Sequence, residues 1–123
     1  MILVDSSVWI DHLRTGDGTL VELLETGQVL AHPFVIGELA LGGLRQRETI
    51  LAALRGLPRA IVASDEEVLQ FIDRQALFGL GIGYIDAHLL AATRLMPGAS
   101  LWTRDKRLRA AADRLALAAV GDG

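Results

Sequence analysis

The sequence predicts an α/β fold in which helices cover both faces of a central parallel sheet. Short apolar runs at residues 2–4, 28–31 and 100–103 have the length of buried strands, and a polar residue follows each of them. Longer segments between these runs repeat their apolar residues at helical spacing. Strands that alternate with helices in this way form parallel sheets with helices on both faces.

The first strand ends in a carboxylate. Residues 2–4 form an apolar run that stops at Asp5, and helical periodicity begins at Val8. The carboxyl end of a buried strand is where α/β sheets bind their ligands. Capping the following helix is the competing role for Asp5. Ser6 or Ser7 can provide that cap instead, which leaves Asp5 available for a ligand.

The remaining segments follow in order along one domain. Ser64 and Glu67 have the spacing of a capping box. Residues 60–63 are expected to form a weak strand and residues 118–120 an edge strand. No repeat, linker or low-complexity segment divides the chain, so we predict a single domain over residues 1–123. Helices are expected near residues 8–14, 20–26, 33–41, 45–54, 64–78, 84–96 and 106–117.

Composition narrows the possible classes of function. The 123 residues include no cysteine, which excludes disulfides and thiolate metal sites. A formal net charge of −3 argues against a general nucleic-acid coat protein but not against a nuclease, whose metal-binding acids lower the charge. No apolar segment has membrane-spanning length and no basic leader is present, so we expect a cytoplasmic protein. The mean hydropathy of +0.37 predicts an oligomer or partner interface.

Four acids are expected at one edge of the sheet. Asp5 and Asp105 end two strands, and Glu38 lies in the helix after another strand. Asp86 lies in the first turn of its helix, among apolar neighbours and with no Lys or Arg three or four residues away. Crossover connections bring the carboxyl ends of parallel strands to the same edge. A carboxylate in an apolar setting such as that of Asp86 needs a partner.

A divalent cation would satisfy such a cluster, because gathered carboxylates raise one another's pKa. Mg²⁺ suits an all-oxygen site, and Mn²⁺ is a chemical substitute. Zn²⁺ fits less well, since His12, His32 and His88 form no ligand pair on a helix face. His88, two residues after Asp86, is expected to be structural. Each acid also has an ordinary alternative role, as a helix cap, a helix-start anion or a solvated helix residue.

Four segments together resemble the PIN-domain family, specifically the VapC-type toxin ribonucleases of bacterial toxin–antitoxin pairs. They are ILVDSSVWID at residues 2–11, GELALG at 37–42, GIGYIDAHLLA at 81–91 and LWTRDKRL at 101–108. The segments occur in the order of the family and span nearly the whole chain. The resemblance implies a three-layer α/β/α fold with a central parallel sheet.

The same resemblance implies a Mg²⁺-dependent endoribonuclease whose four acids are those at the sheet edge. Asp5 and Asp86 are expected to hold the ion most directly, with Glu38 and Asp105 completing its shell. Thr103 matches a supporting hydroxyl position of the family, and Ser7 is expected to play a similar part. Cationic contacts to RNA phosphates are expected from Arg104, Lys106, Arg107 and Arg14, with Arg45 and Arg109 as further candidates and a solvated helix face as the alternative for each.

The implied partners are RNA, a VapB-type antitoxin that inserts a segment near the acids, and a second copy of the chain; a membrane is not among them. The main alternative is a PIN-fold binding module with vestigial catalysis that sequesters a partner protein. Four intact acids count against that alternative. A phosphotransfer receiver or aspartyl-phosphate phosphatase is disfavoured, because Ser6 and Ser7 stand where those proteins need a second acid.

Overall fold

The computed structural model describes residues 1–119 and has a parallel sheet at its centre. Its strands are β1 (Ile2–Val4), β2 (Val29–Leu30) and β3 (Ser100–Trp102), in the spatial order β2-β1-β3. Ile2 pairs with Val29 on one side and with Ser100 on the other, so β1 is the central strand. All three strands expected from apolar runs are therefore present.

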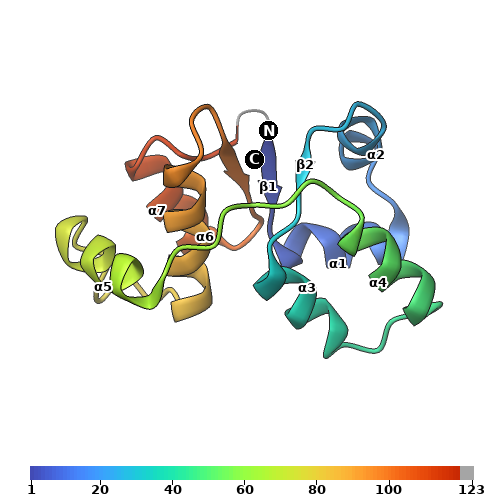
Figure 1. Cartoon of the computed structure of the whole chain (residues 1–123), viewed down its shortest axis with the longest axis horizontal. Helices are drawn as coiled ribbons and strands as arrows, with labels where there is room; N and C mark the ends of the chain where they lie inside the picture. The colour runs from blue at the N-terminus through green and yellow to red at the C-terminus, as the bar shows by residue number, and fades with distance from the viewer. Residues whose placement is uncertain (120–123) are drawn as a thin grey trace.

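Helices cover both faces of this sheet. Figure 1 shows α5, α6 and α7 on one side and α1 to α4 on the other. The expected three-layer α/β/α fold with a central parallel sheet is confirmed. None of these helices has the length and apolar character needed to span a membrane. Within the described residues they are α1 (Ser6–Thr15), α2 (Gly18–Glu25), α3 (Pro33–Ala40), α4 (Arg47–Arg55), α5 (Asp65–Arg74), α6 (Tyr84–Leu95) and α7 (Lys106–Arg114).

The weak strand expected at residues 60–63 is absent. Pairing occurs just before that run, where Arg59 forms a single parallel bridge to Ala31 beside β2. The two β-branched residues at 61 and 62 are each 48% exposed. They leave the sheet because the chain turns there toward Ser64, the N-cap of α5.

The edge strand expected at residues 118–120 is reduced to one bridge in the described part of the chain. Ala118 pairs in parallel with Leu101, and the Leu101 N–H donates to the Leu117 carbonyl at 2.7 Å. The end of this prediction, Val120, lies outside the described residues. A connection after α7 therefore extends the sheet beyond β3.

Helices α5 and α7 end four and three residues earlier than expected, for the same reason. Ala76 and Ala116 adopt left-handed backbone conformations, with φ of 51° and 58°. The next residue in each case, Leu77 or Leu117, is buried and donates its N–H to the last helical turn at 3.0 or 2.8 Å. This closure normally uses glycine. Because alanine occupies both positions, the sequence did not indicate where these helices end.

The hydrophobic core surrounds β1. Leu3 and Val4 are fully buried there, together with Leu89 and Leu90 of α6 and Leu108 of α7. Burying an aliphatic side chain of this size contributes about 1.5–3 kcal/mol. Packing on both faces therefore fixes a very short strand, and Asp5 follows directly at its carboxyl end.

A column of aromatic rings connects α3 to α6. His32, Phe34, His88 and Tyr84 follow one another with edge-to-face contacts and centroid distances of 5.0, 4.7 and 4.7 Å. His32 is fully buried, and its Nδ1 accepts the Phe34 N–H at 3.1 Å to cap α3. Its Nε2 has no hydrogen-bond partner among the described residues. Burial, and then the nearby His88, lower the His32 pKa from 6.5 to about 4.

The substitution His32→Asn should reduce the sensitivity of the fold to acid. The folded pKa of His32 lies below that of the unfolded chain, so stability contributed by the neutral ring is lost as the pH falls from 6.5 to about 4. The loss is about 3 kcal/mol at the lower pH. Asparagine keeps a cap acceptor and does not titrate. Urea unfolding at both pH values should show a smaller loss in the variant, and equal losses would contradict the prediction.

Candidate functional site

Asp5 is a buried carboxylate at the point where β1 passes into α1. It is 5% exposed. Its Oδ2 accepts hydrogen bonds from Ser7 Oγ at 2.7 Å, from Thr103 Oγ1 at 2.8 Å and from the Ser7 N–H at 3.4 Å. These donors come from α1 and from the residue after β3, and both hydroxyls reach the same carboxylate oxygen. Two neighbouring elements therefore fix its orientation.

The expectation that Ser6 or Ser7 caps α1 is wrong, since Asp5 is itself the N-cap and both serines lie within the helix. Within the described residues, the hydrogen bonds to the Asp5 side chain all reach Oδ2. The other oxygen, Oδ1, keeps its capacity to bind a ligand. Capping and ligand binding are compatible because they use different oxygens.

Ser7 and Thr103 also organise the backbone beyond β3. Their hydroxyl oxygens lie 3.3 Å apart. Ser7 Oγ accepts the Arg104 N–H at 3.0 Å, and Thr103 Oγ1 accepts the Asp105 N–H at 3.1 Å. The two residues expected as supporting hydroxyls therefore connect Asp5 to the segment that carries Asp105.

Glu38 lies on α3, within electrostatic reach of Asp5. Loss of solvent raises the pKa of the Glu38 carboxyl, and the charges of Asp5 and Asp86 raise it further. Ser6 Oγ donates a long hydrogen bond of 3.4 Å to Glu38 Oε1, which opposes the increase. Glu38 is exposed as a whole residue, but the charges of the other acids still affect the pKa of its carboxyl group.

Asp86, in the first turn of α6, is half-buried. Loss of solvent raises its pKa, and the charges of Asp5 and Asp105 add to the increase. The Gly83 N–H donates to Asp86 Oδ2 at 3.0 Å and opposes it. No ion pair neutralises this carboxylate within the described residues, which agrees with the absence of nearby basic residues in the sequence.

Asp105 is exposed and is the N-cap of α7. Its Oδ1 accepts the N–H groups of Arg107 and Leu108 at 2.9 and 3.0 Å. The capping role considered for Asp105 is therefore present. Its charge nevertheless reaches Asp86 and contributes to the raised pKa there.

The four acids suit a hard divalent cation in chemistry but do not form a closed ligand set. Residues 1–119 contain no group of three or more Asp, Glu or His side chains arranged to hold a metal ion. Carboxylate oxygens are nevertheless the donors that Mg²⁺ and Mn²⁺ prefer. Loss of solvent and, after it, repulsion among the acids raise the pKa values of Glu38 and Asp86, and a cation would relieve that repulsion. The carboxylate oxygens therefore fit Mg²⁺ or Mn²⁺, and binding of the ion would have to bring the four acidic side chains closer together.

The comparison with known proteins agrees with this architecture. The PIN domain family model matches residues 2–114, which include the sheet and all four acids. The chain belongs to the PIN-domain family. It is 52% identical over 111 residues, or 90% of each chain, to the protein named Ribonuclease VapC32 from Mycobacterium tuberculosis, in strains CDC 1551 and H37Rv. The resemblance to VapC-type PIN proteins is confirmed.

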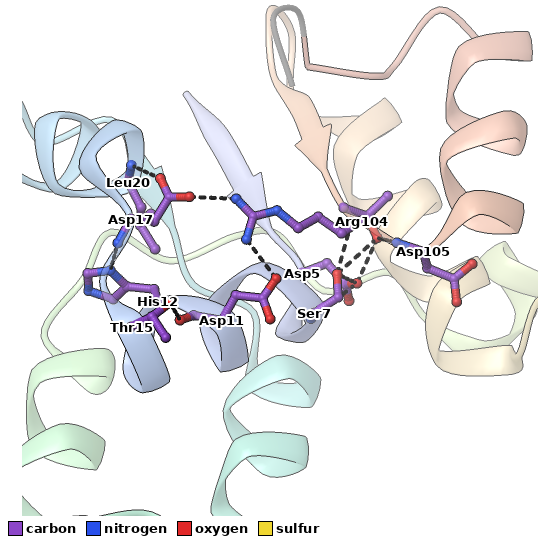
Figure 2. Close-up of polar contacts among 10 residues, drawn as sticks. Asp5, Ser7, Asp11, His12, Thr15, Asp17, Leu20, Arg104 and Asp105 are labelled. Atoms are coloured by element: carbon purple, nitrogen blue, oxygen red, sulfur yellow. Dashed lines mark hydrogen bonds and ion pairs between the residues drawn. The ribbon is translucent and has the colours of Figure 1, made fainter. Parts of the chain in front are cut away.

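The basic residues of this PIN domain differ in their surroundings. Lys106 and Arg107 are exposed at the start of α7. The Arg107 side chain lies over Gly81, where a Cβ atom would come within 2.7 Å of Nη1. Arg104, also expected to contact RNA, forms ion pairs with Asp11 at 2.8 Å and with Asp17 at 2.5 Å (Figure 2). Asp11 therefore has a specific partner and is not simply a solvated acid on the face of α1.

A groove that sequence reasoning did not identify lies between α1 and α3. Its volume is about 550 Å³. Glu38 lines it together with Arg14 and Arg45, which places two of the candidate cations beside one of the acids. The sequence shows Ile10 and Leu13 at helical spacing, but it does not show that a second helix lies beside them to form a groove. The apolar lining comes from Ile10, Leu13, Leu39 and Leu44.

Neutralising Asp86 should stabilise the metal-free PIN domain. Because folding raises the pKa of Asp86, its ionised form opposes folding once the pH exceeds the ordinary value of 3.8. Asp86→Asn keeps an acceptor for the Gly83 N–H and should raise Tm at neutral pH by about 1–4 °C in the presence of chelator. Mn²⁺ should raise the Tm of the wild-type protein and have little effect on the variant.

Differential scanning calorimetry with chelator and with Mn²⁺ measures both effects. Asp73→Asn, at an exposed position of α5, is the matched control and should behave like the wild-type protein. If Mn²⁺ did not change the Tm of the wild-type protein, and Asp86→Asn had the wild-type Tm in chelator, the interpretation of the four acids as a cation site would be contradicted.

Proposed function

We propose that this PIN domain is a Mg²⁺-dependent endoribonuclease, the toxin of a toxin–antitoxin pair, which hydrolyses RNA phosphodiester bonds. The observation that carries the proposal is electrostatic: one buried carboxylate, Asp5, contributes to the raised pKa of two others, Glu38 and Asp86, on separate helices. A relative that is 52% identical and named a ribonuclease supports the choice of RNA as substrate.

In the proposed site, Asp5 and Asp86 hold the ion, and Glu38 and Asp105 complete its shell or hold its water molecules. The chemistry supplied by Mg²⁺, or by Mn²⁺ in its place, is activation of water and neutralisation of charge on the phosphate. Ser7 and Thr103 fix the Asp5 carboxylate through Oδ2 and leave Oδ1 for the ion.

The raised pKa of Glu38 suits it to a second task, which is accepting a proton at Oε1 or Oε2 from the attacking water. Ser6 Oγ, 3.4 Å from Oε1, helps to orient that carboxyl group. A carboxylate with an ordinary pKa would be a weaker base at neutral pH. In this assignment, Glu38 accepts the proton while the fixed Asp5 does not move.

The RNA phosphates would be bound by exposed cations around the acids. Lys106 and Arg107 begin α7 directly after Asp105. Arg14 is a further candidate, because it lines the groove that also contains Glu38. Cations beside more than one of the acids would allow a single strand of RNA to cross the site.

A VapB-type antitoxin is the proposed protein partner, seated in the groove between α1 and α3. The apolar lining suits an amphipathic segment, and Glu38 at its margin offers a carboxylate to a basic residue of that segment. A homodimer is also proposed, since Leu69 and Phe78 near α5 are 56% and 66% exposed. These two apolar regions would serve different partners.

RNA cleavage by the purified protein tests the proposed activity. Cleavage of single-stranded RNA should require Mg²⁺ and stop on addition of chelator. Asp5→Asn should lower kcat by about 100-fold or more, because several kcal/mol of stabilisation at the phosphate is lost. Asp73→Asn is the folded control and should cleave like the wild-type protein. Cleavage that persists in chelator and in Asp5→Asn would exclude a metal nuclease.

The alternative function, a binding module with vestigial catalysis, predicts a different result. Folded wild-type protein would then cleave none of several transfer, ribosomal and messenger RNAs, with or without Mg²⁺. It would still bind its partner protein. The same assay therefore separates the two functions.

Binding of RNA tests the proposed cationic contacts separately from cleavage. In an Asp5→Asn background, Arg107→Gln should weaken binding of labelled single-stranded RNA. It should also reduce the slope of log K against log salt by about 0.7, the value for one phosphate contact on a single strand. Fluorescence anisotropy at several salt concentrations provides the measurement. Arg74→Gln, exposed on α5, should leave the slope unchanged, and an unchanged slope in Arg107→Gln would exclude that contact.

A further inference from the structure

Arg104 connects three elements of the fold through one guanidinium group. Its Nη1 donates to Asp11 Oδ2 on α1 at 2.8 Å, and its Nη2 donates to Asp17 Oδ2 at 2.5 Å. Its Cζ lies 5.5 Å from the centre of the Trp102 ring at the end of β3. Figure 2 shows the side chain extended between the strand end and the two acids. The Arg104 side chain is 29% exposed, so this contact is partly shielded from solvent.

The more buried of the two acids is itself held in place. Asp17 is the N-cap of α2, where its Oδ1 accepts the Leu20 N–H at 2.9 Å. Its own N–H donates to His12 Nδ1 at 3.0 Å. The Leu20 N–H, followed by Arg104, lowers the pKa of the Asp17 carboxyl, so this carboxylate is charged at neutral pH. Arg104 is thus fixed to a rigid point rather than to a mobile side chain.

The backbone of Arg104 lies inside the candidate site although its side chain points away. Its N–H donates to Ser7 Oγ at 3.0 Å, and Ser7 Oγ in turn donates to Asp5. The residue before it, Thr103, donates to Asp5, and the residue after it is Asp105. A displacement of Arg104 would therefore move two hydroxyl contacts and one acid together.

We propose that Arg104 is a positioning residue for the acid cluster and does not contact RNA. By tying residues 103–105 to α1 and α2, its guanidinium keeps the Thr103 hydroxyl on Asp5 and keeps Asp105 at the sheet edge. Asp11 and Asp17 carry two negative charges against one positive charge, and that surplus repels a phosphate. This inference rests on the proposed metal-dependent function, and its test includes measurements that do not require cleavage.

Arg104→Gln and Asp11→Asn distinguish positioning from RNA binding. Loss of a residue that orients metal ligands typically lowers metal affinity or activity by about 10- to 100-fold. We expect Arg104→Gln to lower Mn²⁺ affinity and kcat by about that factor, with KM for RNA and the salt slope of RNA binding unchanged. Asp11→Asn should also lower Mn²⁺ affinity and kcat, because it removes one of the two carboxylates that hold the guanidinium.

An RNA contact would give the opposite pattern. Arg104→Gln would then raise KM and reduce the salt slope, while Asp11→Asn would release the guanidinium and tighten RNA binding. That result would overturn the inference. The double variant should be no worse than Arg104→Gln alone, since both substitutions break the same contact. Arg104→Lys should restore only part of the Mn²⁺ affinity, because an ammonium cannot reproduce the paired geometry of the guanidinium.

Two controls exclude general destabilisation. Arg74→Gln removes an exposed arginine from α5 and should change neither Mn²⁺ affinity nor kcat. A lower Tm in Arg104→Gln with wild-type Mn²⁺ affinity and kcat would show a merely structural role and would overturn the inference. If Arg104→Gln does not fold, the milder Asp11→Asn decides, since the Asp11 side chain is 49% exposed.

Failure of the inference is separable from failure of the proposed function. If the wild-type protein cleaves RNA and Arg104→Gln has the same Mn²⁺ affinity and kcat, the positioning role is refuted but the proposed function is not. Wild-type protein that binds Mn²⁺ without cleaving RNA refutes the function, and the calorimetric comparison of Mn²⁺ affinities still decides the inference. If the wild-type protein binds no Mn²⁺, amide exchange at Asp105 decides: faster exchange in Arg104→Gln supports positioning, and an equal rate refutes it.

Discussion

The site depends on the shared hydrogen bonds of one buried carboxylate oxygen, Asp5 Oδ2. Ser7 Oγ and Thr103 Oγ1 both reach it, from α1 and from the end of β3. These two hydroxyl donors are close enough to fix the carboxylate in one orientation, and Oδ1 remains for a ligand. Because the hydroxyls also accept the backbone N–H groups of Arg104 and Asp105, the same contacts hold the neighbouring segment in place. Strand pairing alone, over three residues of β1, would not give this precision.

The cost of this arrangement is the loss of solvent around the carboxylates, with repulsion between them added to it. Glu38 and Asp86 both have raised pKa values, which means that their ionised forms oppose folding at neutral pH. The fold tolerates this because aliphatic packing around β1 and α6 is extensive, with Leu89 and Leu90 fully buried. A cation that reduced the repulsion would therefore stabilise the protein and complete the site in one step.

Much of the fold and the choice of the four acids followed from local patterns, whereas several details depended on tertiary contacts. Apolar runs located the three strands, and the isolation of Asp86 from basic neighbours singled out its carboxylate. The ends of α5 and α7 were missed because Ala76 and Ala116 occupy left-handed positions at which sequence rules expect glycine. The cap of α1 was misassigned because Ser6, Ser7 and Asp5 are all good caps, and only the backbone conformation of Asp5 distinguishes them.

The direction of the Arg104 side chain has a simple geometric cause. Side chains in an extended segment point alternately to opposite sides. Since Thr103 points to Asp5, Arg104 must point the other way, to the side of Trp102, two residues earlier. Proximity to Asp105 in sequence suggested a role beside the acids, but alternation carries the guanidinium toward α1 and α2. A basic residue next to a site acid in an extended segment is therefore better placed to hold the segment than to contact the substrate.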